Sequence, residues 1–478
     1  MSTLLPRLLP LGLAAALSAC VAGPPPEIAT PAPELPAAYA LAVDEASAAS
    51  LDALLPQDDP AYASLSQAAL ERAPTLLEAI ARIDAARAGA RRSGAERLPN
   101  FGIDANITEN RTNPNQFGED NPFVPLIETT QISYGANITA RWDADLFGRL
   151  RAQERAALAR VDAASASASA VRLALLAEIA GSVVDWRALD ARMQAIENDV
   201  AAAIRLADLA KTREDAGIAP GFDRVRAESQ ASASRSRLAA LKSERARLIG
   251  RLVTLTSLNG SDVVSALSRP GSMQKLDATP ANLPSQLLTN RPDILAASAE
   301  LAASDAELAA TARARFPRLT LSGVLGLLSF SPSDFFDEDS IVRTLTAGVA
   351  APLLDFGRIE AEIEGAAANK KVAFQAYRGA VFQALGDAEA AYGLVAAADE
   401  QATLAAQERD ELERAASLAN DRYQAGLSSF LEVLEARRAA DTSGERAAAA
   451  MGAAQRARIV LWQALGGDAS TTERSNSA

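Results

Sequence analysis

Long stretches without proline constrain this chain more than any other feature of its sequence. Of the 23 prolines, ten lie before residue 61, and none lies in 126–219, 221–269 or 353–478. Proline interrupts a helix interior because its ring removes a backbone donor and clashes with the preceding turn. The sequence therefore predicts helices far longer than the usual length of about 11–12 residues.

The residue types that are missing exclude many kinds of chemistry. The chain has no histidine, one cysteine and a formal net charge of −13. Without histidine, nucleophilic triads are excluded in their usual form, and the commonest metal ligand and general base are missing. A single cysteine excludes an intrachain disulfide and a multi-cysteine metal centre. We expect no enzyme activity, no catalytic or metal-binding residues and no cofactor, and the negative charge argues against nucleic acid as a partner.

The N-terminal residues indicate export and lipid attachment. Residues 1–19 have a basic Arg7 and a short apolar run, which is typical of a signal peptide. The run ends in Leu17-Ser18-Ala19-Cys20, which resembles the bacterial lipobox. The resemblance implies that Cys20 becomes the first mature residue and carries diacylglycerol and an N-acyl lipid; an ordinary signal peptide with a chance cysteine is the alternative. Residues 20–60 then form a proline-rich tether.

The rest of the chain contains two copies of one unit. Arg291-Pro292-Asp293-Ile294 repeats Ala73-Pro74-Thr75-Leu76, and Phe356-Gly357-Arg358 repeats Phe147-Gly148-Arg149. Motifs repeated about 210 residues apart indicate a duplication and not a short-repeat solenoid. We place the copies at 61–258 and 292–466, with an equatorial connection at 259–291 and a flexible tail at 467–478.

Each copy carries two candidate strands in which apolar and polar residues alternate. The strands are expected at about 101–109, 131–143, 319–329 and 341–351. Their lengths suit tilted strands that cross a bilayer, which need about 9–11 residues. A soluble sheet with one wet face has the same alternation and is the competing interpretation.

Each pair of strands is followed by a long helix and a shorter returning helix. We expect the long helices at about 145–213 and 355–423 and the returning helices at 222–258 and 430–466. Apolar residues in the second long helix, from Phe374 to Val395, recur with an average spacing close to 3.5, which is typical of a left-handed helical seam.

The number of strands predicts an oligomer. Four strands cannot close a barrel, and a membrane does not tolerate open strand edges. Two copies would supply eight strands, which fill a barrel with side chains and leave no pore. Three copies would supply twelve strands and leave room for a channel.

Several motifs resemble the TolC-type outer membrane efflux proteins, in particular the lipidated NodT-type branch. They are the lipobox, the Arg-Pro-Asp-Ile motif, both Phe-Gly-Arg motifs and the segment from Arg422 to Ala436. The resemblance implies a mainly α fold with transmembrane β-strands, arranged as a homotrimeric channel-tunnel. A 12-stranded β-barrel, with four strands per chain, would continue into a long α-helical coiled-coil barrel.

The resemblance also implies a location, partners and a passive role. The chain would be lipid-anchored in the bacterial outer membrane, surrounded by outer membrane lipid, with its tunnel in the periplasm. It would bind a periplasmic membrane-fusion adaptor and an inner membrane RND-type pump, and conduct small toxic compounds outward. A type I protein secretion tunnel is the alternative within this class. A periplasmic adaptor or structural coiled-coil lipoprotein and a periplasmic enzyme are less well supported, because neither explains the duplicated strand–helix order.

The resemblance places a periplasmic gate at the two helix turns. It implies that Glu432 and Glu435 narrow the entrance, with Asp223 at the equivalent first turn and Tyr423 holding the entrance shut through a hydrogen bond. Positions three apart share a helix face, so three-fold symmetry would bring these carboxylates together. Alternatively, the two glutamates are solvated or pair with Arg437 and Arg438. Gly217 and Gly426 mark the turns expected to contact the adaptor.

Overall fold

The computed structural model describes most of the chain, in two compact units. The described residues are 27–42, 50–113, 128–271, 276, 279–280 and 284–467. One unit contains 84–162 and 299–375 with part of the N-terminus, and the other contains 32–83, 163–298 and 376–478. The predicted signal peptide, Cys20 and most of the C-terminal tail lie outside the described residues.

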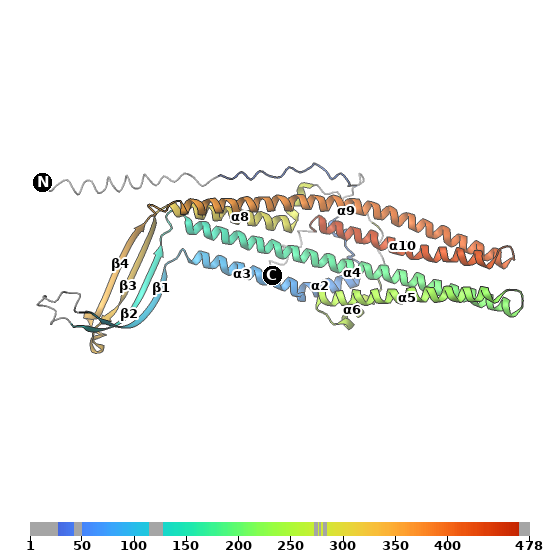
Figure 1. The fold of residues 1–478 in the computed structure, drawn as a ribbon, viewed down its shortest axis with the longest axis horizontal. Coiled ribbons are helices and arrows are strands. Elements are labelled where there is room, and N and C mark those ends of the chain that lie inside the picture. Colours follow the sequence, from blue (N-terminus) through green and yellow to red (C-terminus); the bar gives the residue numbers. More distant parts are fainter. Residues whose placement is uncertain are drawn as a thin grey trace. The chain divides into compact units, whose positions relative to one another are not determined.

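The first unit contains one antiparallel sheet with the order β1-β2-β3-β4 (Figure 1). Its strands are β1 (Asn100–Arg111), β2 (Thr130–Asp143), β3 (Arg318–Ser329) and β4 (Ile341–Ala350). They lie within two residues of the ranges expected from alternation. β1 and β4 each pair on one side only, so the sheet has two open edges.

The strand register collects apolar side chains on one face of the sheet. Ile103 pairs with Ile138, Ile138 with Leu325, and Leu325 with Arg343. Side chains alternate along a strand, so every second residue from these positions shares their face. This face holds the most exposed apolar residues of the strands, among them Phe101, Ile103, Ile107, Leu345 and Val349. The opposite face carries mainly Asp, Asn, Ser, Thr and Gly in β1 and β2, such as Asp104, Asn106 and Thr139.

Both long helices begin three or four residues later than the sequence predicted. They are α4 (Arg149–Asp215) and α9 (Arg358–Gln424). The expected starts, 145 and 355, are instead capping residues. The Asp145 carboxylate accepts hydrogen bonds from the amides of Leu150 and Arg151, at 2.8 and 3.0 Å. The Asp355 carboxylate likewise accepts from the amides of Gly357 and Ile359, at 3.2 and 3.0 Å. Carboxylates at these positions satisfy free N–H groups of the first turn.

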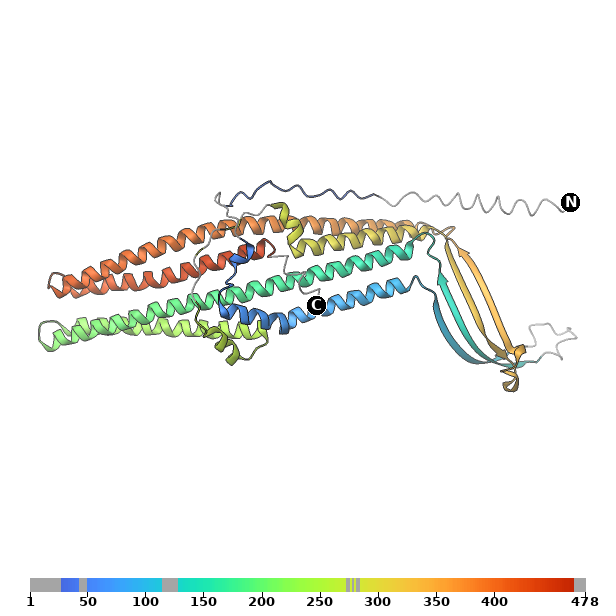
Figure 2. The ribbon, with the colours of Figure 1, turned by 180° about the vertical axis from the view of Figure 1, so that it is seen from behind.

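The remaining long helices pair with α4 and α9 as hairpins. The returning helices are α5 (Gly221–Thr256) and α10 (Phe430–Ala464), and α4–α5 and α9–α10 lie side by side in both views (Figures 1 and 2). The helices before the strands are α3 (Pro74–Ala95) and α8 (Pro292–Ala312). Shorter elements complete the described fold: η1 (Leu51–Leu54), α2 (Pro60–Arg72), α6 (Gly260–Leu267), η4 (Pro284–Gln286), α7 (Leu287–Asn290), η5 (Arg313–Arg315), η6 (Pro332–Asp334) and η7 (Glu338–Ser340).

The second unit is held by one large apolar core and several buried arginines. Trp186, Ile179 and Leu461 are almost fully buried there, as are Val381 and Tyr392 of the predicted apolar seam. Burial of such side chains contributes about 1.5–3 kcal/mol each. α4 also contains an 18-residue stretch that is apolar enough to cross a membrane by length and composition, and half of that stretch is buried within the chain.

The arginine of the Arg-Pro-Asp-Ile motif joins three segments of this unit. Arg291 donates to the Ala464 carbonyl oxygen at the end of α10, at 2.8 Å, and forms ion pairs with Asp293 and Asp387, at 2.6 and 3.1 Å. Its backbone lies just before α8, so the motif fixes the entry to the second repeat. The Arg-Pro-Asp-Ile motif therefore has a structural role in the second repeat.

The N-terminal tether is attached to α9. The Glu389 carboxylate accepts hydrogen bonds from the backbone amides of Ala40 and Leu41, at 2.8 and 3.0 Å. Tyr39 is buried against Tyr392, with ring centroids 5.1 Å apart. The end of the tether is thus fixed to the helical unit through its backbone.

Candidate functional site: the two hairpin turns

The two long helices end in the same backbone motif. Gly217 and Gly426 have φ angles of +71° and +75°, in the left-handed region that favours glycine. Each glycine amide donates to a carbonyl three residues back, at 2.8 and 3.0 Å, and the next amide donates to a carbonyl five residues back, at 2.9 and 2.8 Å. These paired bonds define the Schellman motif. The duplicated Ala-Gly sequence therefore codes for two identical helix ends.

The interiors of the two turns differ. In the first, Glu214 forms an ion pair with Arg224 at 2.8 Å, and Gly221 leaves space for it, because a Cβ there would lie 2.4 Å from the Glu214 carboxylate. The repeat places Tyr423 and Phe430 at the positions of Glu214 and Gly221. Gly221 of the first turn thus accommodates a charged side chain where the second turn has aromatic packing.

Tyr423 packs among residues of all four helices of the two hairpins. It is 5% exposed, and its ring meets that of Phe430 edge-on, with centroids 5.7 Å apart. The Arg213 guanidinium of α4 lies over the same ring at 4.6 Å. The apolar cluster around them includes Ala210 of α4, Ala227 of α5 and Val433 of α10. Ring packing and a cation–π contact hold Tyr423 here, and its role in a gate stays a prediction.

Glu432 and Glu435 are exposed in the single chain, and Asp223 is partly exposed. All three lie in or near the first turn of a returning helix, and Ser429 caps α10 by accepting a hydrogen bond from the Glu432 amide at 3.3 Å. Arg437 does not pair with either glutamate; its partners are described below. The two glutamates therefore share an exposed face close to the second turn.

The sequence analysis did not predict a pair of buried carboxyl groups, one on α4 and one on α10. Asp199 of α4 and Asp441 of α10 are 4% and 2% exposed. Burial, together with the hydrogen bond and the charge of Asp441, raises the pKa of Asp199 to about 7. The buried carboxyl group of α10 thus favours the protonated form of the one on α4, so the two hairpins are coupled electrostatically at this point.

Arginines from two helices surround this pair. Arg437 of α10 contacts Asp441 at 2.7 Å, Glu413 of α9 at 2.9 Å and Asp199 at 3.7 Å. Arg237 of α5 lies 4.0 Å from Asp199 and 3.5 Å from Glu445 of α10. A charged network thus connects α4, α5, α9 and α10. The sequence signal for this network was Asp441, a carboxylate among the apolar positions of α10.

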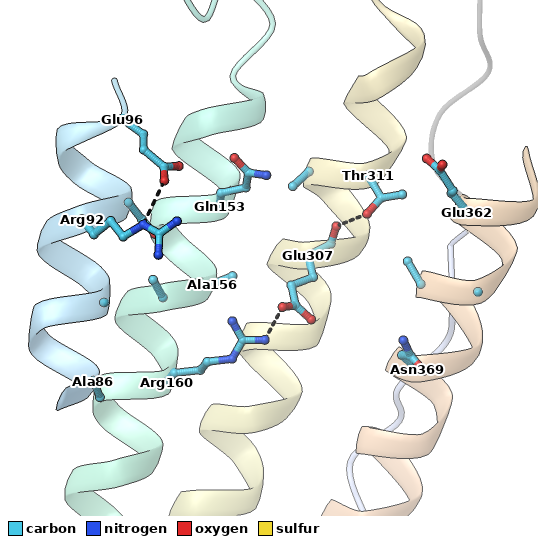
Figure 3. A pocket seen from close by; sticks show the side chains of 16 residues that line it. Ala86, Arg92, Glu96, Gln153, Ala156, Arg160, Glu307, Thr311, Glu362 and Asn369 are labelled. Carbon is cyan, nitrogen blue, oxygen red and sulfur yellow. Dashed lines mark hydrogen bonds and ion pairs between the residues drawn. The ribbon is translucent and has the colours of Figure 1, made fainter. Parts of the chain in front are cut away.

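A separate hollow of about 860 Å³ lies among α3, α4, α8 and α9 in the first unit. Figure 3 shows its lining side chains, several of which pair with one another: Arg160 with Glu307, and Arg92 with Glu96 at 3.4 Å. Much of the rest of the lining is alanine and glycine, such as Ala156. We assign no ligand to it. Among the described residues no group of three or more His, Cys, Asp or Glu is placed to hold a metal ion.

Comparison with known proteins identifies the family. The profile of the family described as outer membrane efflux protein matches residues 65–260 and 283–467. The chain belongs to the outer membrane efflux protein family. It is 30% identical to the pyoverdine export outer membrane protein OpmQ of Pseudomonas aeruginosa over 414 residues, which cover 85% of each chain. It is 28% identical to nodulation protein T of Rhizobium leguminosarum bv. trifolii, over 88% of this chain and 89% of that one.

The fold of an outer membrane efflux channel is confirmed by a solved structure. The outer-membrane channel OprN superposes with a TM-score of 0.83 and 25% identity, over 93% of this chain and 98% of that one. The predicted NodT-type resemblance, the channel-tunnel fold class and the outer membrane location are confirmed. The chain is an outer membrane channel of the efflux class, and its relatives are channel proteins and not enzymes.

Proposed function

We propose that three copies of this chain form a conduit that carries small toxic compounds from a periplasmic membrane-fusion adaptor and an inner membrane RND-type pump to the exterior. The observation that carries the proposal is the sheet, which has one apolar face and two open edges. Such a sheet is stable in a bilayer only when other strands close it. Three copies supply twelve strands, enough for an open channel.

The hairpin turns are proposed as the periplasmic entrance. Gly217 and Gly426 would present the turns to the adaptor, because Ile218 and Leu427, the residues that follow them, are 68% and 70% exposed. Glu432, Glu435 and Asp223 would line the aperture, with Tyr423 fixing the second turn. Cys20 would carry the diacylglycerol and N-acyl lipid that anchor the chain.

Reconstitution tests the conduit. The full mature protein, extracted in detergent, is expected to be a trimer by native mass spectrometry and to conduct ions in planar bilayers. Copurification from membranes should recover an adaptor, and deletion of the gene should raise sensitivity to small toxic compounds. A monomer without conductance would contradict the proposal, and loss of an exported protein without change in drug sensitivity would favour type I secretion.

A further inference from the structure

Three charged residues interrupt the apolar face of the sheet, and two of them, Glu109 and Arg343, lie on opposite edge strands. Glu109 of β1 shares this face with Phe101, Ile103 and Ile107, since side chains alternate along the strand. Arg343 of β4 shares it through the pairing of Leu325 with Arg343. Both residues are exposed, and neither has an ion pair within the part of the chain that the structure describes. An unpaired charge on a lipid-facing surface is destabilising, increasingly so with depth.

The two charges lie at equal distances from corresponding strand ends. β1 ends at Arg111, and β4 begins at Ile341. These ends both adjoin the hairpin loops, on the side away from the helices. Glu109 is two residues before the end of β1, and Arg343 is two residues after the start of β4. Arg111 shares the face of Glu109, but it is the last residue of its strand.

Closure of a barrel brings these two strands together. All strand pairs in the sheet are antiparallel, so β4 of one subunit and β1 of the next run antiparallel when they meet. The apolar faces must lie on the same side of the barrel, which allows only registers in which odd-numbered residues face odd-numbered residues. With the outer strand ends level, Glu109 faces the partner subunit's Arg343. A shift by two residues that brings Ile107 opposite the partner subunit's Arg343 makes the pair diagonal, which long side chains still span. The opposite shift would bring Arg111 against that arginine, and like charges directly opposite each other are destabilising.

We propose that Glu109 and the partner subunit's Arg343 form an ion pair across each seam of the barrel, on its lipid-facing side near the outer end. The inference rests on the proposed trimer and adds the contact that selects the seam register. Because this pair forms only between subunits, it favours closure of the barrel over an open sheet.

Cysteine cross-linking in the full chain tests the seam register. Glu109→Cys with Arg343→Cys reports strand ends that are level, and Ile107→Cys with Arg343→Cys reports the register shifted by two residues. One of these pairs should give covalent trimers on oxidation. Glu109→Cys with Val349→Cys is the control, because Val349 is six residues further along β4, about 20 Å away. Cross-linking by neither test pair in a preparation that is trimeric overturns the seam pair; a monomer contradicts the proposed function instead.

Charge reversal tests the ion pair itself. Glu109→Arg and Arg343→Glu, each alone, should lower the temperature at which the trimer dissociates in SDS, and the double variant should regain at least half of the loss. A double variant no more stable than the weaker single variant overturns the proposal. If the double variant shows no recovery and, of the two single variants, only Arg343→Glu lowers the dissociation temperature, Arg343 instead contacts an anionic lipid headgroup. If a single variant does not assemble, recovery of trimers in the double variant remains decisive.

Discussion

Gly217 and Gly426 show how a single residue sets the length of a helix. No heavy atom lies within 4 Å of the position that a Cβ would occupy at either glycine. The backbone conformation alone therefore requires glycine, and a left-handed L-residue costs about 1–2 kcal/mol. We expect Gly426→Ala to lower the thermal unfolding temperature and Gly426→Asn to lower it less, measured by intrinsic fluorescence. Equal effects of the two substitutions would contradict a purely conformational requirement.

The exposed glutamates near the second turn are predicted to control ions. Glu432→Ala with Glu435→Ala should raise the conductance or the passage of large antibiotics and weaken cation preference, because carboxylates at a constriction attract cations and repel anions. Planar-bilayer recordings in a salt gradient measure both. Glu411→Ala is the matched control, because Glu411 is also an exposed carboxylate but lies on α9, farther from the turn. Unchanged conductance and selectivity would contradict a gate formed by these two glutamates.

At the scale of the helices and strands, local sequence patterns predicted where the elements lie, whereas contacts between residues far apart in the sequence were not predicted. Alternation located all four strands, and proline-free stretches located both long helices, because each signal is local. The helix starts were misplaced because Asp145 and Asp355 act as caps, which depends on backbone geometry. Asp199 and Asp441 were missed because they lie far apart in the sequence and meet only when α4 packs against α10. Tyr423 was located, but its packing against Arg213 was not foreseen.

The buried carboxyl pair predicts how the hairpins respond to pH. The pKa of Asp199, about 7, lies above the ordinary value of an aspartate, so between about pH 4 and pH 7 this carboxyl group holds a proton in the folded protein that it has released in the unfolded chain. Stability should therefore fall as pH rises through this window and level off above about pH 7. Asp441→Asn removes one ionisable group and keeps a hydrogen-bonding side chain, so it should flatten this dependence.

Thermal unfolding of the solubilised protein between pH 5 and pH 8 measures the effect. Asp410→Asn, at an exposed aspartate of α9, should leave the profile unchanged. Stability that rises from pH 5 to pH 8 in the unaltered protein would contradict the raised pKa of Asp199. So would an unaltered slope in Asp441→Asn.

At the scale of the whole molecule, lipid attachment at the N-terminus stays a prediction, because Cys20 lies outside the described residues. The tether reaches α9 through Glu389, so Cys20 lies only some twenty residues before a fixed point of the chain. Cys20→Ser should abolish labelling by radioactive palmitate and the corresponding mass increase of the mature protein. Glu389→Gln keeps Cys20 and should retain the lipid. Palmitate labelling of Cys20→Ser would contradict lipidation at this residue.

Because the two turns have different interiors, their contacts are expected to respond oppositely to added salt. Added salt screens the Glu214–Arg224 pair and weakens it, whereas salts of the kosmotropic series strengthen apolar contacts such as Tyr423 with Phe430. Warming within the physiological range also affects ionic and apolar contacts unequally. The same change of salt would thus weaken the ion pair in the first turn and strengthen the ring contact in the second, so the duplicated sequence carries two turns with separate environmental sensitivities.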